Sequence, residues 1–348
     1  MQESIFTSAM RSFFKAFCAI IGLGGGLILM ILLAGALPDK TSLLKEPDSV
    51  YTPEIVANAM GRRFKIGSEA PIILKLNISG VIGTDKLNMN TFRTQLTESR
   101  EGHFESNPPS ALLLNIQSPG GTVIDADGIY RAIKSYKEQY KIPVYAYVDG
   151  LCASGGMYIS AAADKVYASD VSLIGSIGVI SPPIFNFTKT MDKIGVEALT
   201  LSAGIGKDEL NSFRNWGPNE GKSYQSIINS YYDHFVNVMS SNRKAIDKTK
   251  LVKDYGAQIF SAKEAEEFGF IDGSGISLNE TLNLLAKEIH VKDDQYQVVQ
   301  LEKKTLLSDL FGTDFSILKG QVKHRLDFSP DLSPEIMNQF LYLYRPGL

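Results

Sequence analysis

The stretch IPVYAYVDGLCASGGMYISAAA occupies residues 142–163 and joins two kinds of local pattern. Its first part, residues 142–150, predicts a strand, and a helix that begins near Ser154 is predicted to carry MYISAAA. An upstream segment has the same organisation, because the nearly continuous apolar run ALLLNIQ (111–117) precedes SPGG (118–121) and a helical pattern. Such a run is typical of a strand buried on both faces. Strands that alternate with helices predict an α/β domain with a mainly parallel sheet.

The remaining segments continue this alternation. Strands are expected near residues 71–83, 165–169, 175–180 and 197–203, and helices near residues 53–63, 88–99 and 219–246. Ser261 and Glu264 have the spacing of a capping box, which predicts a short helix that ends at Gly269.

Composition excludes several classes of protein. The chain has 348 residues, of which 44% are apolar, and this is enough for a full hydrophobic core. A formal net charge of -3 gives no overall basic character, so no nucleic-acid partner is expected. Cys18 and Cys152 lie far apart in sequence and form neither a disulfide framework nor a zinc motif. Since no metal or nucleotide motif is present either, we expect no cofactor.

The N-terminal region contains a candidate membrane anchor. Residues 16–37 are 22 consecutive uncharged and mainly apolar positions, and about 20 such residues span a bilayer as a helix. Arg11 and Lys15 precede this segment, so the positive-inside rule places residues 1–15 in the cytoplasm and the rest of the chain in the periplasm or outside the cell. A cleavable signal peptide is the alternative, because residues 34–36 read AGA. The apolar stretch is longer than a usual signal-peptide core, which favours a single-pass anchor in the cell (inner) membrane.

The rest of the chain divides into three predicted parts. Residues 38–68 are polar and contain three prolines, which indicates a linker. Residues 69–292 carry the strand and helix patterns of a catalytic domain, and residues 293–348 form a C-terminal extension. This extension ends in the apolar stretch FLYLYRPGL (340–348), for which two interpretations stay open. It either occupies a groove or packs on a neighbouring molecule, and we favour packing.

Ser154 is the first candidate for chemistry. A serine at the start of a helix is most often an N-cap, and paired glycines most often only make tight turns. The two glycines that directly follow Ser154 favour a second interpretation, in which its hydroxyl is a nucleophile. The backbone N–H groups of Gly121 and Gly155 would then point at one place, as the oxyanion hole of an acyl-transfer enzyme requires.

A serine nucleophile needs a base. The four histidines, His103, His234, His290 and His324, lie outside the glycine-rich and strand-end segments, which disfavours a Ser-His-Asp triad. A lysine can serve instead when burial favours its neutral form. Lys207, in SAGIGKDE, follows a predicted apolar strand. Spacing alone does not select it from the other lysines of this region, which are Lys165, Lys189, Lys193 and Lys222.

Five segments together resemble the signal peptide peptidase A family, the Ser/Lys membrane peptidases of family S49, whose fold is related to those of Clp protease and crotonase. They are SPGG, CASGGMYISAAADKVYAS, LIGSIGVI, SAGIGKDEL and QIFSAKEAEEFGFID, in this order between about residues 70 and 290. The resemblance implies that Ser154 is the nucleophile and Lys207 the general base. It further implies that Ser176 orients the lysine and that Gly121 and Gly155 donate to the oxyanion. Gln117 departs from the family, which usually has asparagine before SPGG.

The resemblance also implies substrates and assembly. The expected substrates are signal-peptide remnants and other short or unfolded peptides, which need an apolar groove; candidates to line it are Ile116, Ile124, Met157 and Ile180. Family members with one copy of the domain form ring-like homo-oligomers in which neighbouring subunits contribute the serine and the lysine of one site. Two other functions stay open: an inactive membrane-tethered scaffold of the same fold and a crotonase-like acyl-CoA enzyme. The second accounts for neither the Ser/Lys pair nor an outward-facing anchor.

Overall fold

The computed structural model describes residues 13–19, 21–26, 49–63, 69–291, 295–303 and 340–344. The chain divides into two compact units, Met1–Asp48 and Ser49–Leu348. In the first unit, residues 13–19 and 21–26 are helical, and the rest of the predicted span at 16–37 lies outside the described residues. Among the residues that are described, no helix combines the length and the apolar character needed to cross a bilayer.

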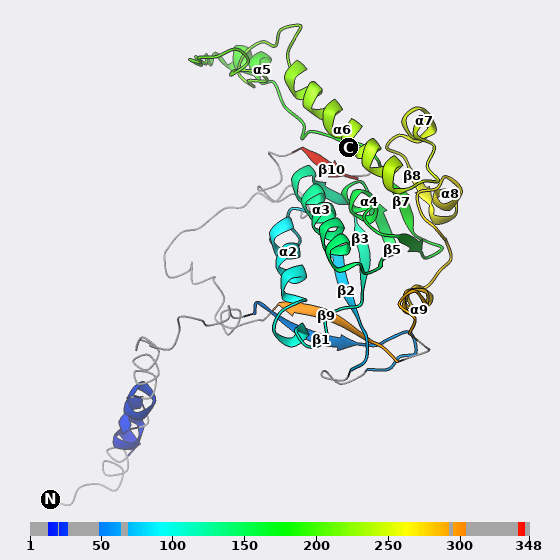
Figure 1. The fold of residues 1–348 in the computed structure, drawn as a ribbon. Coiled ribbons are helices and arrows are strands. Elements are labelled where there is room, and N and C mark those ends of the chain that lie inside the picture. The colour runs from blue at the N-terminus through cyan, green and yellow to red at the C-terminus, as the bar shows by residue number, and fades with distance from the viewer. Residues whose placement is uncertain are drawn as a thin grey trace, which may run out of the picture. The chain divides into compact units, whose positions relative to one another are not determined.

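An eight-stranded sheet forms the centre of the second unit (Figure 1). Its strands run in the order β1-β9-β2-β3-β5-β7-β8, and β6 pairs with β5. The pairs β2/β3, β2/β9, β3/β5, β5/β6 and β5/β7 are parallel, whereas β1/β9 and β7/β8 are antiparallel. The predicted α/β class with a mainly parallel sheet is therefore confirmed. The strands are β1 (Tyr51–Val56), β2 (Ile72–Ser79), β3 (Ala111–Ser118), β5 (Val144–Ala153), β6 (Lys165–Ala168), β7 (Leu173–Gly175), β8 (Ile259–Ser261) and β9 (Gln297–Lys303).

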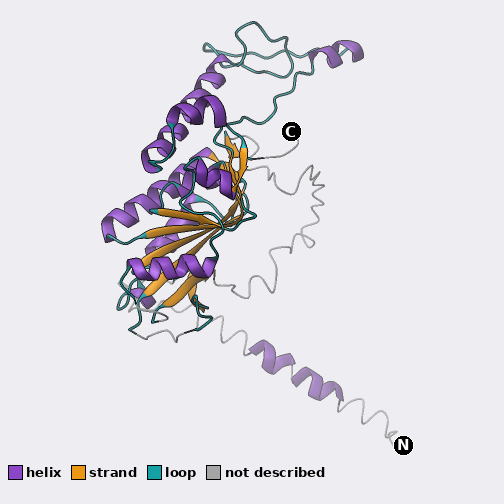
Figure 2. Cartoon of the chain, turned by 90° about the vertical axis from the view of Figure 1, so that its right-hand side faces the viewer, coloured by secondary structure: helices purple, strands orange, loops and turns teal. Residues whose placement is uncertain are grey.

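Helices cover both faces of this sheet (Figures 1 and 2). The α-helices of the second unit are α2 (Met89–Glu98), α3 (Val123–Tyr140), α4 (Gly155–Ser160), α5 (Thr188–Ile194), α6 (Lys222–Asn242), α7 (Lys248–Lys250), α8 (Ala262–Glu267) and α9 (Leu278–Glu288). Two shorter turns are η2 (Gly102–Phe104) and the π-helical η3 (Leu251–Tyr255). A separate pair of short strands, β4 (Gly120–Thr122) and β10 (Leu341–Leu343), lies beside α3 and α4.

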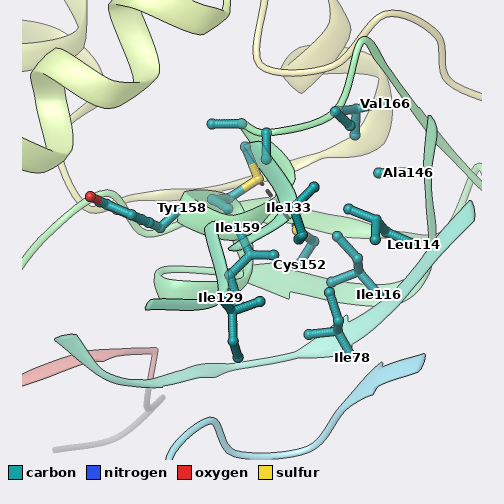
Figure 3. Packing of buried hydrophobic residues seen from close by; sticks show 14 of the residues in the cluster. Ile78, Leu114, Ile116, Ile129, Ile133, Ala146, Cys152, Tyr158, Ile159 and Val166 are labelled. Atoms are coloured by element: carbon teal, nitrogen blue, oxygen red, sulfur yellow. Dashed lines mark hydrogen bonds between the residues drawn. The ribbon is translucent and has the colours of Figure 1, made fainter. Parts of the chain in front are cut away.

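The side chains of β3 alternate between two hydrophobic clusters. Leu114 belongs to the larger cluster, together with Ile129 and Ile133 of α3 (Figure 3). Leu113 points the other way and joins the smaller cluster with Leu285 of α9. Because successive strand residues face opposite sides of a sheet, an uninterrupted apolar run fits a strand that is covered on both faces. The prediction that residues 111–117 form such a strand is confirmed.

Several predicted helix boundaries agree with the structure. The predicted helix at 88–99 corresponds to α2, and the helix at 219–246 corresponds to α6. The capping box is present, because Ser261 Oγ accepts a hydrogen bond from Glu264 N–H while the Glu264 carboxylate accepts one from Ser261 N–H. These contacts are local in sequence, so the sequence pattern alone was sufficient to predict them.

Three local predictions are wrong. The segment 197–203 forms no strand, and its apolar side chains are exposed, with Leu199 at 85% and Leu201 at 86%. Within the predicted linker 38–68, residues 51–56 form β1 instead of a helix and pair with β9. The predicted C-terminal extension contributes β9 to the sheet, where it lies between the edge strand β1 and β2. Each error concerns long-range pairing, or its absence, which local patterns do not report.

We predict that Leu114→Ala lowers the free energy of unfolding by about 2–5 kcal/mol, because it removes apolar volume from a fully buried position. Val171→Ala is the control, since it removes apolar atoms from a side chain that is 82% exposed and lies outside the core. Its effect should stay within about 0.5 kcal/mol. Chemical denaturation followed by circular dichroism measures both, and equal effects would contradict the assignment of the core.

Candidate active site

Ser154 occupies a strained turn between a strand and a helix. It follows the last residue of β5 and precedes the first residue of α4, and its backbone angles are φ 52° and ψ −113°. Residues with a Cβ rarely adopt a positive φ of this kind, which costs on the order of 1–3 kcal/mol. Two hydrogen bonds hold the turn, from Ser154 N–H to Gly175 O (2.9 Å) and from Tyr158 N–H to Ser154 O (2.9 Å). A strained residue that is fixed by its surroundings is a frequent feature of functional sites.

The Ser154 side chain does not cap α4. The helix has no side-chain hydrogen bond at its N-cap. Ser154 is 1% exposed, and its Oγ has no hydrogen-bond partner among the described residues. A buried hydroxyl without a partner costs about 1–3 kcal/mol. The common structural explanation for a serine at this position is therefore wrong, and a reactive hydroxyl fits the geometry better.

The backbone of β4 comes close to residue 82. Ile82 N–H donates to Gly120 O (2.9 Å), and Thr122 N–H donates to Ile82 O (3.0 Å). These bonds use residues 120 and 122, so the N–H of Gly121 between them points toward the opposite side of the strand. A methyl group on Gly121 would overlap Ile82 O, so only glycine allows this approach.

Gly155 lies next to this glycine pair. A methyl group on Gly155 would stand 3.2 Å from Gly121 N and 3.2 Å from Gly120 Cα. The structure thus brings together Gly121, Gly155 and Ser154, which are more than 30 positions apart at their extremes. Two glycine amides beside a serine hydroxyl match the arrangement of an oxyanion hole.

Ser176 lies beside Ser154. Ala153 of β5 and Gly175 of β7 are direct partners in the sheet, so the two serines that follow them leave the sheet at the same level. Ser176 is 6% exposed, has φ 56°, and donates its N–H to Gln258 O (2.7 Å). This position next to the nucleophile candidate is compatible with the orienting role implied by the family resemblance.

Lys207 is not joined to Ser154 within one chain. Its side chain is exposed, and Ser154 Oγ is bonded to no described residue. Lys207 belongs to a segment that we call the arm, residues 184–216, which includes α5 and extends beyond the sheet in Figure 1. None of the side chains of α5 is buried.

A group of charged residues holds the base of the arm together. Arg214 bonds to Asp208 (2.5 Å) and to Glu220 (2.8 Å). Hydrogen bonds from Arg214, and next from the backbone N–H of Leu210, lower the pKa of the Glu220 carboxyl to about 2. Hydrogen bonds from Asn211, and next from Arg214, lower the pKa of Asp208. Lys207 therefore immediately precedes, in sequence, the first residue of this hydrogen-bonded cluster, Asp208.

The histidines do not complete a triad. His103, His234 and His290 lie in the described part of the chain, and none of them bonds to Ser154 Oγ. The nearest interaction of His234 is with Asp127, at 3.6 Å. His324 lies outside the described residues.

Sequence reasoning missed the aromatic residues next to the site. Tyr158 of α4, Phe235 of α6 and Tyr342 of β10 are fully buried, and their ring centroids lie 4.6–5.2 Å apart. Figure 3 shows Tyr158 extending away from the aliphatic side chains of the core. Its hydroxyl donates to Asp127 Oδ1 (2.8 Å), and burial, followed by the charge of Asp127, raises its pKa. The only sequence signal was the position of Tyr158, one helical turn after Ser154.

The predicted groove residues are only partly correct. Ile116 and Met157 are fully buried in the core and cannot line a groove, whereas Ile124 is 62% exposed. Ile180 does lie at the site, because it exchanges two backbone hydrogen bonds of 3.0 Å with Leu341. The stretch that includes Leu341 therefore pairs with Ile180 and with β4 of its own chain, and the preferred prediction that it packs on a neighbour is wrong for residues 340–344.

Comparisons with known proteins identify the family of this chain. The model of peptidase family S49 matches residues 136–292, a range that includes Ser154, Ser176 and Lys207. The chain is 30% identical to "Putative signal peptide peptidase SppA" from Enterococcus faecium, over 78% of this chain and 81% of the relative. It is 31% identical to "Serine protease SPPA, chloroplastic" from Arabidopsis thaliana, over 52% of this chain and 26% of the relative.

A solved structure of a ClpP1 mutant from Listeria monocytogenes is also similar, with 18% identity and a TM-score of 0.40. That comparison covers 60% of this chain and 94% of the ClpP1 chain. Family membership rests on the sequence matches. This chain belongs to peptidase family S49, with relatives of the signal peptide peptidase A type.

Proposed function

We propose that this protein is a membrane-anchored serine peptidase in which Ser154 and Lys207 form a catalytic dyad. The observation that carries the proposal is the Ser154 hydroxyl, which is buried and unbonded on a strained turn beside the amides of Gly121 and Gly155. Membership of family S49 supports peptide hydrolysis, because the named relatives are described as proteases.

The proposed reaction is acyl transfer in two steps. The neutral amine of Lys207 takes the proton of Ser154 Oγ, which attacks the carbonyl carbon of a peptide bond. The amides of Gly121 and Gly155 donate to the resulting oxyanion, and the proton passes to the leaving amine as the C–N bond breaks. Water, activated by the same lysine, then hydrolyses the ester and frees Ser154. In both steps, Ser176 orients the lysine.

In this proposal the lysine comes from a neighbouring subunit, which is supported by the exposure of Lys207 and the burial of Ser154 in the same chain. The arm has the surface of a subunit contact. Large apolar side chains along it are at least 40% exposed: Ile184, Phe185, Phe187, Ile194, Val196, Leu199, Leu201, Ile205 and Phe213. A patch of this kind usually marks a protein interaction site. A second copy that covers the arm would remove Lys207 from water, which favours the neutral amine that the mechanism needs.

The proposed substrates are signal-peptide remnants and other short or unfolded peptides at the membrane surface. Buried aromatic rings beside Ser154 suit apolar side chains. Residues 16–37 would anchor the enzyme as a single span, with the catalytic unit in the periplasm or outside the cell.

Ser154→Ala and Lys207→Ala should each lower kcat for a fluorogenic peptide by roughly 10⁴-fold or more, since each removes a group that reacts. Ser176→Ala should cost less, because it removes only an orienting partner. Lys193→Ala is the control for Lys207, since Lys193 is also an exposed lysine of the arm. A wild-type rate for Lys207→Ala would reject the dyad. If wild type cleaves no peptide and a serine-reactive probe leaves Ser154 unlabelled, the protein is an inactive scaffold.

Mixing inactive variants tests the shared site. When Ser154→Ala and Lys207→Ala subunits are combined in equal amounts and reassembled, about a quarter of the sites would pair an intact serine with an intact lysine. Peptidase activity should therefore return to roughly 25% of wild type, because only those sites contain both of the groups that react. No recovery in mixed oligomers whose composition is verified by mass spectrometry would place both residues in one subunit.

Membrane attachment is tested by fractionation. A spanning helix resists an alkaline wash that strips peripheral proteins, because its apolar residues lose their lipid contacts on extraction. We expect the full chain to stay in the washed membrane pellet, detected by antibody. Release into the supernatant would contradict the anchor and would leave the proposed dyad unaffected.

A further inference from the structure

We infer that Arg214 is a positioning residue for the proposed catalytic base: it ties the backbone beside Lys207 to the start of α6 and thereby holds the amine at a defined place on the arm. This inference rests on the proposed function, in which Lys207 is the base of the dyad. The observations that carry it are the hydrogen bonds of Arg214 to two separate segments and the packing of α6 on the core.

The backbone around Lys207 is a series of tight turns. Residues 204–210 contain neither helix nor strand, and Lys207 N–H donates to Gly204 O in a single turn (3.3 Å). Leu210 has φ 61°, and a residue with a Cβ keeps such a conformation only where its surroundings hold it. Contacts from outside these turns therefore fix the direction in which the Lys207 side chain leaves the arm.

Arg214 holds the residue that directly follows Lys207. Its Nε donates to Asp208 Oδ2 (2.5 Å), and its Nη2 donates to the backbone O of Asp208 (2.5 Å). The other carboxylate oxygen of Asp208 accepts from Asn211 Nδ2 (2.5 Å). Because a planar trans peptide fixes the separation of consecutive Cα atoms, holding both the side chain and the backbone of Asp208 restrains Lys207 as well.

The same guanidinium group bonds to the residue two positions before α6. Arg214 Nη1 donates to Glu220 Oε2 (2.8 Å), and Arg214 Nη2 donates to Glu220 Oε1 (2.9 Å). A bidentate pair of this kind has a defined planar geometry that a lysine does not reproduce. Glu220 Oε1 also accepts the N–H of Leu210. Arg214 and Glu220 therefore join the turns at Lys207 to the start of α6.

Helix α6 connects these hydrogen bonds to the core. At its beginning, Ser223 N–H donates to Glu209 Oε1 (3.2 Å). Farther along, Phe235 is fully buried, and its ring lies 5.1 Å from that of Tyr158 in α4. Helix α4 begins directly after Ser154, so α6 leads from the arm to the serine side of its own chain (Figure 1). The polar contacts beside the proposed base are thus attached to a helix that packing holds in place.

The position of Arg214 argues against a role in fold stability alone. Its side chain is 37% exposed, and those of Asp208 and Glu220 are 24% and 11% exposed. Ion pairs in contact with solvent add little to the free energy of unfolding. Their dense bonding at this surface is better explained by the geometry that it imposes on the neighbouring Lys207.

Steady-state kinetics of the assembled enzyme test this role. Arg214→Gln should lower kcat for a fluorogenic peptide about 100-fold and leave KM unchanged, because a misplaced reacting group slows the chemical step. Glu220→Gln should lower kcat by a smaller factor, since it keeps the shape of the side chain and loses the charge. Arg214→Lys should recover only part of kcat, because an ammonium group lacks the fork. Arg93→Gln is the control, since Arg93 is an exposed arginine of α2, outside the arm.

A double variant separates positioning from a general structural role. With Lys207 intact, Arg214→Gln should slow the labelling of Ser154 by a serine-reactive probe about 100-fold. In the Lys207→Ala background there is no base to position, so Arg214→Gln should not slow the residual labelling any further. Equal slowing in both backgrounds would show that Arg214 supports only the fold, and would overturn the inference.

The outcomes distinguish this inference from the proposed function. A wild-type kcat for Arg214→Gln and Glu220→Gln, in an enzyme that Lys207→Ala inactivates, overturns the positioning role and leaves the dyad intact. A wild-type rate for Lys207→Ala rejects the dyad and the positioning role together. Circular dichroism and native mass spectrometry check the fold and assembly of each variant. If Arg214→Gln fails to fold or assemble, Glu220→Gln provides the test, in the same two backgrounds.

Discussion

The site depends on the turn at Ser154, where a strand ends and a helix begins within one residue. The parallel pairing of β5 with β7 fixes the strand, and the hydrogen bond from Ser154 N–H to Gly175 O fixes the turn itself. The positive φ then directs the side chain away from the N-cap position, and Oγ is left without a partner. The strain and the lost hydrogen bond each cost on the order of 1–3 kcal/mol. The well-packed sheet and its two helical layers supply the free energy that holds this turn in place.

Glycine is required at this site for the close approach of backbones. Gly121 passes Ile82 at a distance that excludes a Cβ, and Gly120 does the same at Tyr342 O. As a result, Gly155, which directly follows Ser154, lies close to the backbone of Gly121. The same backbone edge that supplies an amide for the oxyanion also pairs with β10, so binding and chemistry share one strand.

The exposed arm and the buried serine explain why one chain forms only part of the proposed site. Residues 184–216 bury few of their apolar side chains, while the serine side of the site is fully packed. An assembly would bury this surface and add the missing amine in the same step. Coupling of catalysis to assembly would also limit peptide cleavage by isolated subunits, which carry both residues but do not bring them into contact.

Local signals in the sequence were sufficient for much of the fold. The apolar run at 111–117 and the Ser261 capping box each depend on neighbouring residues, and the corresponding elements formed as predicted. The prediction of a strand at 197–203 is wrong. Its apolar side chains have the pattern of a strand, but the segment pairs with no other strand. The predicted membrane span lies largely outside the described residues and stays a prediction.

By itself, the sequence determined the fold class, the family and the identity of Ser154, Gly121 and Gly155 as site candidates, because the motifs that carry them are contiguous. Only the tertiary structure decided that Ser154 is not a helix cap, that β9 lies between β1 and β2, and that the Tyr342 ring stacks on Tyr158. The physical reason is that strand pairing and ring packing join residues that lie far apart in sequence, such as Tyr51 and Lys303, and their energies depend on register and distance in space. No local pattern around residue 342 encodes the position of residue 121 or 158.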